Sequence, residues 1–216
     1  MSESPVRSPC RSPRPRDLPG SLEADRPGCR IPLLLASASP RRRDLLRNAG
    51  IEFQVQPAQV EEVASGPWAP RELCVINAKR KAMEVARMFP DRLVLGADTI
   101  VAFEGSIFGK PGDLREARGM LERLCGRTHE VLTGVCLIQK SRRKLCSFIE
   151  STRVKFRPRQ DVDLEEYLRT VQPLDKAGGY AAQEDEGRLI EQVEGSMSNV
   201  IGLPVDRVLA ALDRHF

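Results

Sequence analysis

One carboxylate interrupts a stretch of the chain that otherwise reads as a buried β-strand. Asp98 lies within residues 93–101, LVLGADTIV, where the other side chains are apolar or small. An unpaired charge in a protein interior costs several kcal/mol, so a buried Asp is usually paired, metal-bound or used in catalysis. The residues leave three interpretations open for Asp98: a metal ligand, a general base for a water molecule, or one half of a structural ion pair.

A second group of residues that could bind a ligand is the basic segment Ser37-Ala38-Ser39-Pro40-Arg41-Arg42, which joins a predicted strand to a predicted helix. Positive charge in the first helical turn is disfavoured by the helix dipole by roughly 0.3–1 kcal/mol per side chain. This predicts a compensating anion such as phosphate, bound by backbone N–H groups, serine hydroxyl groups and a guanidinium. A solvated basic helix start explains the segment equally well. The Gly-rich pattern of a P-loop is absent.

Further carboxylates and lysines could complete a site for a polyphosphate. Glu61 or Glu62 could supply the second carboxylate that a hard cation such as Mg²⁺ uses together with substrate oxygens and water. A solvated acidic turn is the simpler interpretation of these two residues alone. Lys81 lies on a predicted helix, and Lys110 precedes a proline that stiffens its loop. The number of lysines around Asp98 favours a polyphosphate held through a metal.

Hydrophobic periodicity and capping residues predict the elements that would position these side chains. Strands and helices alternate early in the chain and hairpins follow later, which favours one α/β domain with a twisted mixed β-sheet flanked by helices. The first half is predicted to hold strands at 31–36, 51–55 and 93–101 and helices at 40–49 and 70–88. The second half is predicted to hold a turn at 104–105, a capped helix between Asp113 and Gly126, a hairpin of 129–138 with 145–157, a short helix near 161–170, an ordered functional loop over 172–187, a strand at 189–193 and a final helix from Pro204.

Composition narrows the class of protein. The 216 residues carry 34 Lys and Arg against 30 Asp and Glu, intermixed along the chain, which is unlike a protein that coats nucleic acid. The six cysteines form no C-x-x-C pair and the two histidines are isolated, so no zinc site is expected. No apolar stretch approaches the ~18 residues of a membrane span, and no secretory signal is visible. We therefore expect a cytoplasmic protein without nucleic-acid or membrane partners.

The first 30 residues differ in composition from the rest. They are rich in Pro, Arg and Ser and hold few periodic apolar residues, so we expect a disordered tail at 1–30 and one folded domain at 31–216. A tail that contacts an acidic partner through its arginines is an open alternative.

Six short blocks resemble, in the same order, the signature blocks of the Maf family of nucleoside triphosphate pyrophosphatases, which are historically linked to septum formation. The resemblance covers about Ile31 to the C-terminus. The blocks are Ala36 to Arg42, Gly96 to Thr99, Gly109 to Pro111, His129 to Thr133, Asp175 to Tyr180 and Asn199 to Pro204.

The resemblance implies an inosine-triphosphatase-like architecture and a role for each matching residue. Asp98 matches the family's proton acceptor, and Glu62 with Asp98 would hold a divalent metal cation (Mg, Mn or Co). The phosphate- and metal-site residues of the family match Ser37, Arg41, Glu62, Lys81 and Lys110, with Lys110 assigned to catalysis. The base-selecting residues of the dTTP/UTP branch match Arg41, Thr99 and Gln183, and Tyr180 with Gln183 is expected to face the base. One departure is the run Glu184-Asp185-Glu186, which stands where the family commonly has Gly after the glutamine and would add carboxylates beside the expected base pocket.

The implied activity is hydrolysis of the α–β phosphoanhydride of dTTP, UTP and modified pyrimidine nucleotides to a nucleoside monophosphate and pyrophosphate. A homodimer and a role in cleaning the nucleotide pool are also implied. The main alternative is a non-catalytic regulator of cell division that binds a nucleotide or a protein through the same cleft. RNA binding by the basic tail is a third interpretation.

Overall fold

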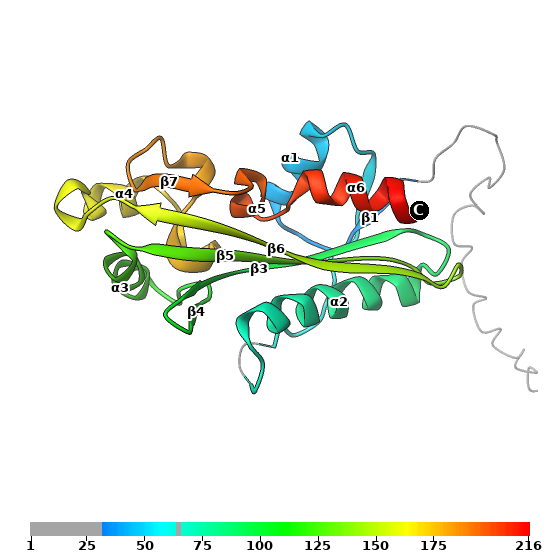
Figure 1. Ribbon diagram of the computed structural model, residues 1–216. Helices are drawn as coiled ribbons and strands as arrows, with labels where there is room; N and C mark the ends of the chain where they lie inside the picture. Colours follow the sequence, from blue (N-terminus) through cyan, green and yellow to red (C-terminus); the bar gives the residue numbers. More distant parts are fainter. Residues whose placement is uncertain (1–31, 64–65) are drawn as a thin grey trace, which may run out of the picture. The chain divides into compact units, whose positions relative to one another are not determined.

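The computed structural model describes residues 32–63 and 66–216, which form one compact unit. The tail predicted at 1–30 lies outside the described residues. The strands are β1 (Leu33–Leu35), β2 (Phe53–Val55), β3 (Val94–Phe103), β4 (Ser106–Phe108), β5 (Thr128–Gln139), β6 (Lys144–Phe156) and β7 (Ile190–Glu194). The α-helices are α1 (Pro40–Asn48), α2 (Pro70–Met88), α3 (Leu114–Leu124), α4 (Leu164–Thr170), α5 (Met197–Ile201) and α6 (Val205–His215) (Figure 1).

The described strands form one seven-stranded mixed sheet in the order β2-β1-β3-β5-β6-β7, with β4 added to the far end of β3. The pairs of β1 with β2 and with β3 are parallel, and the pairs of β3 with β4 and β5, of β5 with β6 and of β6 with β7 are antiparallel. Helices lie on both faces of the twisted sheet (Figure 1). The predicted fold class is therefore confirmed. No helix in the described part of the chain is long and apolar enough to cross a membrane.

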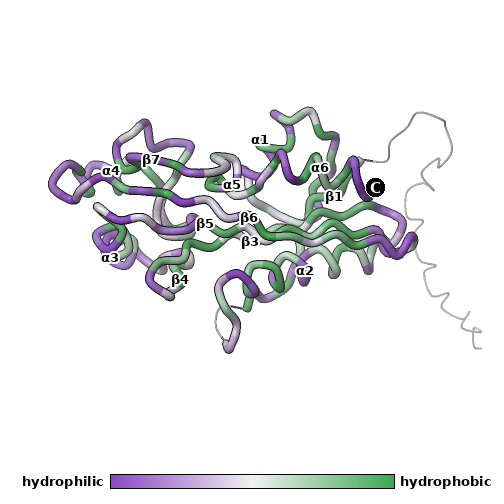
Figure 2. Tube along the Cα trace, in the orientation of Figure 1, coloured by the Kyte–Doolittle hydropathy of each residue, from purple (hydrophilic) through white to green (hydrophobic). Residues whose placement is uncertain are grey.

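Two apolar layers hold helices against the sheet. Figure 2 shows that the strands crossing the middle of the sheet are hydrophobic, while the tip of the β5–β6 hairpin is hydrophilic. On one face, α2 packs Ala78, Ala82 and Val85 against side chains of β1, β3 and β5. On the other face, Leu46 of α1 and Val208 of α6 pack against alternate side chains of the same strands. The alternation is the period of two expected of strands buried on both faces.

Two glycines allow α2 to approach the sheet very closely. A Cβ atom on Gly96 of β3 would lie 2.4 Å from the carbonyl oxygen of Ala78, and one on Gly134 of β5 would lie 2.4 Å from that of Cys74. Real Cβ atoms essentially never approach so closely, so only glycine fits at these positions without a backbone shift. The backbone of α2 thus rests directly on β3 and β5. This contact brings polar side chains of α2 within reach of Asp98.

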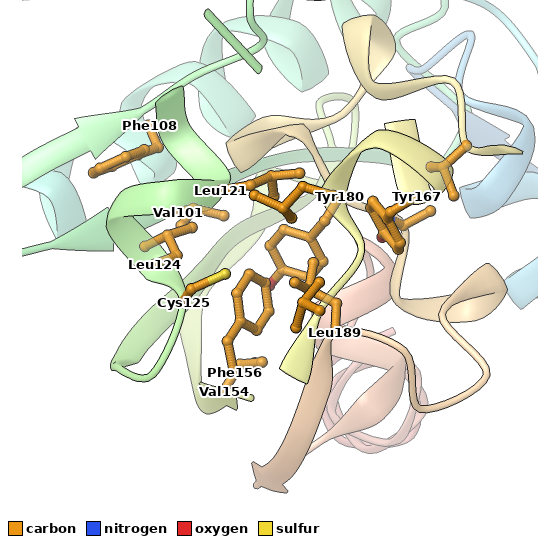
Figure 3. Close-up of a cluster of buried hydrophobic side chains, with 14 of the residues drawn as sticks. Val101, Phe108, Leu121, Leu124, Cys125, Val154, Phe156, Tyr167, Tyr180 and Leu189 are labelled. Carbon is orange, nitrogen blue, oxygen red and sulfur yellow. The ribbon is translucent and has the colours of Figure 1, made fainter. Parts of the chain in front are cut away.

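A separate core cluster lies at the end of the sheet that carries α3, α4 and β7. Tyr180 and Phe156 lie together in this cluster (Figure 3). Their rings and that of His129 meet edge to face, with ring centroids 4.7–5.5 Å apart. The Tyr180 hydroxyl group and Nε2 of His129 are 3.0 Å apart. His129 is buried with 2% of its surface exposed, and burial lowers its pKa from 6.5 to about 4. The imidazole is therefore neutral in the folded protein at neutral pH.

This buried histidine predicts a loss of stability on mild acidification. Between pH 6.5 and about 4 the unfolded chain binds a proton at position 129 that the folded chain does not bind, so the free energy of unfolding falls as pH decreases. The contribution approaches 1.4 kcal/mol per pH unit and totals roughly 3 kcal/mol. Urea unfolding at pH 7, 6 and 5 should show a shallower pH dependence for His129→Gln than for the wild type. Parallel curves for the two proteins would contradict this assignment.

Candidate active site

A cavity opens at the one stretch of β3 that lacks a strand neighbour on its β1 side. β1 pairs with β3 only as far as Leu95, and β4 pairs with β3 only from Val101 onward. Between these points no described strand covers that edge. The cavity of about 780 Å³ lies here, beside the middle of β3 and at the carboxyl ends of the parallel strands β1 and β2. Open α/β sheets commonly bind ligands at such a position.

The cavity brings together the residues that the sequence assigned to a site, except for Glu61, the alternative to Glu62. Its walls come from the β1–α1 junction, the segment before α2, α2 itself, β3, the β4–α3 loop and the 3₁₀ turns between α4 and β7. The nominated residues in its lining are Ser37, Arg41, Glu62, Lys81, Asp98, Thr99, Lys110, Tyr180 and Gln183.

Asp98 is buried yet reaches the cavity. Asp98 is 5% exposed. Its Oδ1 accepts a hydrogen bond from Nζ of Lys81 at 2.6 Å, and its Oδ2 accepts one from Nδ2 of Asn77 at 3.2 Å. The ion-pair interpretation of Asp98 thus holds as a description of its contacts. The pair is not sealed into the core, because Asp98, Lys81 and Asn77 all line the cavity. Its presence there leaves the metal-ligand and general-base interpretations open.

Lys81 joins Asp98 to a second carboxylate. Its Nζ also lies 2.6 Å from Oε1 of Glu62, whose side chain is 49% exposed. Glu62 lines the cavity and Glu61 does not; Glu61 only accepts a hydrogen bond from Arg80 through its carbonyl group. Partial burial raises the pKa of Glu62, but the hydrogen bond and charge of Lys81, with the charge of Lys110, outweigh this and lower the pKa overall. Glu62 is therefore ionised at neutral pH.

Arg42 also lines the cavity, although the sequence analysis named it only within the basic segment and gave it no role of its own. Its Nε donates to the carbonyl oxygen of Gly202 at 2.9 Å, Nη1 to Oγ of Ser37 at 3.1 Å and Nη2 to Oγ1 of Thr99 at 3.1 Å. Burial lowers its pKa, with the charge of Asp98 opposing that effect. Arg42 therefore fixes the β1–α1 junction to β3 and to the end of α5. The hydroxyl groups of Ser37 and Thr99 thus both accept hydrogen bonds from this guanidinium.

Arg41 points to a different partner. Its Nη1 donates to Oδ2 of Asp175 at 2.8 Å and its Nη2 to the Asp175 carbonyl oxygen at 3.2 Å. The buried Lys176 donates from Nζ to Oδ1 of the same carboxylate at 2.8 Å. Partial burial raises the pKa of Asp175, yet hydrogen bonds from Lys176 and Arg41 and their charges lower it overall. The cavity thus has two clusters of charged side chains. One consists of Arg41, Asp175 and Lys176. The other consists of Glu62, Lys81 and Asp98, with Lys110 and Arg42 nearby.

Two residues expected at the nucleobase have different surroundings. Tyr180 is 6% exposed and lies in the core cluster (Figure 3). Its hydroxyl group is hydrogen-bonded to the buried His129. Gln183 is exposed where it lines the cavity, and its Nε2 is 3.5 Å from Oε1 of Glu184. Gln183 is therefore freer than Tyr180 to meet a ligand.

The acidic run after Gln183 turns away from the cavity. None of the residues Glu184, Asp185 and Glu186 is part of the cavity lining. Asp185 is 3% exposed, and its carboxylate accepts hydrogen bonds from the backbone N–H groups of Leu189 at 3.1 Å and Ile190 at 2.9 Å. This run therefore fixes the loop to the start of β7. It adds no carboxylate to the cavity.

The two carboxylates on Lys81 have the chemistry of a shared divalent-cation site. The described residues contain no group of three or more His, Cys, Asp and Glu side chains that could enclose a metal by themselves. Mg²⁺ sites that act on phosphates commonly use one or two carboxylates, with phosphate oxygens and water completing the shell. Glu62 and Asp98 converge on one point, since both lie 2.6 Å from the same Nζ. They fit a metal whose remaining ligands come from a bound phosphate group.

The fold and the cavity together define a class of protein. It is an α/β protein in which two carboxylates lie among arginines and lysines at the open edge of a strand. These are the side chains that a site for phosphate groups and a divalent cation requires. The chain belongs to the Maf-like protein family, whose model matches residues 32–215. The resemblance inferred from the six sequence blocks is thereby confirmed.

Individual relatives cover nearly the same part of the chain. The dTTP/UTP pyrophosphatase of Pelotomaculum thermopropionicum is 42% identical over 84% of this chain and 95% of its own length. The dTTP/UTP pyrophosphatase of Akkermansia muciniphila is 44% identical over the same shares. Among solved structures, the Ham1 protein of Staphylococcus aureus matches with a TM-score of 0.48 and 14% identity, over 84% of this chain and 97% of that one.

Proposed function

We propose that this protein hydrolyses the α–β phosphoanhydride of dTTP and UTP to a nucleoside monophosphate and pyrophosphate, and so removes unwanted nucleotides from the cellular pool. Relatives that share more than 40% of their residues with this chain carry that activity in their names. The single observation that carries the proposal is the Glu62–Lys81–Asp98 group on the open edge of β3. It places ionised oxygens and a cation at one wall of a cavity large enough for a nucleotide.

In this proposal Asp98 orients the attacking water molecule and accepts its proton. Asn77 fixes one oxygen of the carboxylate through its hydrogen bond, so the other oxygen has a defined direction. A divalent cation bound to Glu62 and Asp98 would supply a lowered pKa for the attacking water and neutralise phosphate charge. Asp98 is thus the proton acceptor, and Glu62 is a second negative ligand.

Cationic side chains stabilise the charge that develops on the phosphates as the bond breaks, and this stabilisation usually contributes most to the catalysis of phosphoryl transfer. We assign this work to Lys81, Lys110 and Arg42, because their charges act on Glu62 next to the reacting centre. Arg41 is already neutralised by Asp175 and therefore suits hydrogen bonding to a nucleobase, together with Gln183. Thr99 acts in this scheme through the guanidinium of Arg42, and Ser37 does the same.

Three finer assignments extend this proposal beyond the chemistry of the cavity. They are Mg, Mn or Co as the cation, assembly as a homodimer, and location in the cytoplasm. We also propose modified pyrimidine nucleotides as additional substrates.

The purified full-length protein should be incubated with dTTP, UTP, CTP, GTP and ATP in the presence of Mg²⁺, Mn²⁺ or Co²⁺, and its products separated by chromatography. We expect dTMP or UMP in equal amounts with pyrophosphate, and slower turnover of the purine nucleotides. Tight binding of a nucleotide without turnover under every metal would contradict the proposal and favour a non-catalytic regulator.

A further inference from the structure

Lys81 occupies the position between two carboxylates that a metal ion would take. Its Nζ lies 2.6 Å from Oδ1 of Asp98 and 2.6 Å from Oε1 of Glu62, and its side chain is only 11% exposed. The direct packing of α2 on Gly96 keeps the Lys81 backbone close to β3. A single ammonium group is therefore the resident cation of this acidic pair.

An ammonium group and a divalent cation compete for the same oxygen lone pairs. With Lys81 in place, the three side chains carry a formal net charge of −1; without it, the two carboxylates would carry −2 and would repel each other. A divalent cation that enters alone must displace a salt-bridged, largely buried ammonium group, which reduces its net gain.

Lys81 has a mobility that the neighbouring arginine lacks. Arg42 is fixed by three hydrogen bonds to Gly202, Ser37 and Thr99, none of which is a carboxylate. The ammonium group of a lysine sits on a flexible four-carbon stem and can change partners by rotation. A triphosphate in the cavity would offer Lys81 phosphate oxygens of higher charge than one carboxylate.

We infer that Lys81 serves as a built-in substitute for the metal: it holds Glu62 and Asp98 until a nucleotide arrives, then moves to the phosphates and releases both carboxylates to a divalent cation. The cation and the nucleotide consequently bind with positive cooperativity, and the cation alone binds weakly. The nucleotide part of this inference rests on the proposed function, whereas the weak binding of metal alone does not.

The first test measures binding of Mn²⁺ by electron paramagnetic resonance, without nucleotide, to the wild type, Lys81→Met and Lys79→Met. Lys79 lies on the same helix but is exposed and outside the cavity lining, so its replacement is the matched control. We expect Lys81→Met to bind Mn²⁺ at least about tenfold more tightly than the wild type, since one opposing charge at ion-pair distance is removed. Lys79→Met should bind like the wild type.

Equal Mn²⁺ affinity of Lys81→Met and the wild type would overturn the inference, and so would an equal gain in both lysine variants. Circular dichroism and thermal unfolding establish that each variant is folded before titration.

A second measurement uses the wild type and therefore does not depend on a variant that folds. The dissociation constant of Mn²⁺ is compared with and without an α,β-imido analogue of dUTP, which resists hydrolysis, with a protein-free control for Mn²⁺ bound to free analogue. We expect the analogue to tighten Mn²⁺ binding by about tenfold or more in the wild type, because it draws Lys81 away from the two carboxylates. The gain should be smaller in Lys81→Met, which has no ammonium group to move.

Tight Mn²⁺ binding to the wild type in the absence of the analogue would contradict the inference. If the Mn²⁺ measurements come out as expected but the protein does not hydrolyse nucleotides, the proposed reaction is refuted. The inferred role of Lys81 toward the metal is then unaffected. The two failures are therefore distinguishable.

Discussion

Asp98→Asn should lower kcat for pyrophosphate release from dTTP by about 10²–10⁴-fold, the range that loss of a general base produces. Asn has nearly the shape of Asp but cannot accept a proton from water and offers no negative charge to a cation. Lys81 keeps its salt bridge to Glu62, so the variant is not left with an unpaired buried charge. The expected result is a large fall in kcat with the fold retained.

Steady-state kinetics and thermal unfolding of the same preparation test this prediction. Asp213→Asn is a suitable control, because Asp213 is exposed on α6 and outside the cavity lining. Its turnover should equal that of the wild type. Turnover of Asp98→Asn within a few-fold of the wild type, in a folded protein, would remove Asp98 from the role of proton acceptor.

Gly96→Ala should destabilise the protein by about 3 kcal/mol, at the upper end of the cost of overpacking. The added Cβ would lie 2.4 Å from the carbonyl oxygen of Ala78 and 2.8 Å from Cβ of Ala82, so the backbone of α2 must move away from β3. The same movement carries Lys81 away from Asp98. Activity should therefore fall together with stability.

Gly119→Ala supplies the matched control for the added methyl group. A Cβ at Gly119, within α3, meets nothing within 4 Å. Replacement of glycine by alanine inside a helix stabilises by roughly 0.5–1 kcal/mol. Urea unfolding should therefore shift in opposite directions for the two variants. A wild-type midpoint for Gly96→Ala would contradict the close packing of α2.

The elements that position the site could largely be predicted from local signals. Helix α2 was expected over 70–88 and is found at Pro70–Met88, because Pro70 marks its start and Pro90 lies two residues beyond its end. The β5–β6 hairpin and the strand around Asp98 were also expected. Helix α5 was missed, since Met197–Ile201 is too short for a hydrophobic period to show.

Contacts between distant segments could not be predicted in the same way. Arg41 and Asp175 are 134 residues apart, and local patterns do not specify which of two adjacent arginines faces which partner. Nothing in the sequence indicated that Asn77 lies on the buried face of α2, because polar side chains interrupt the apolar pattern of this helix. Lys81 was assigned to the site by the family resemblance and not by this pattern. The burial of Asn77 and Lys81 makes sense only with Asp98 opposite them.

The residues of the family motifs could be located in the sequence, but the contacts of their side chains could not be predicted from it. Tyr180 was expected to face the base; it lines the cavity, but its hydroxyl group is bonded to His129 inside the core. The acidic run beginning at Glu184 was expected beside the base, whereas left-handed backbone at Glu186 and Gly187 turns it toward β7. Backbone direction within a loop depends on dihedral angles that residue type alone does not determine.

Identification of the reaction products in ¹⁸O-labelled water tests the central claim most directly. Wild-type protein, dTTP and a divalent cation should give dTMP and pyrophosphate in equal amounts by ³¹P nuclear magnetic resonance, with one ¹⁸O atom per cleaved bond. Formation of dTDP and orthophosphate, or recovery of unlabelled dTTP alone, would contradict cleavage at the α–β phosphoanhydride by a water molecule activated at Asp98.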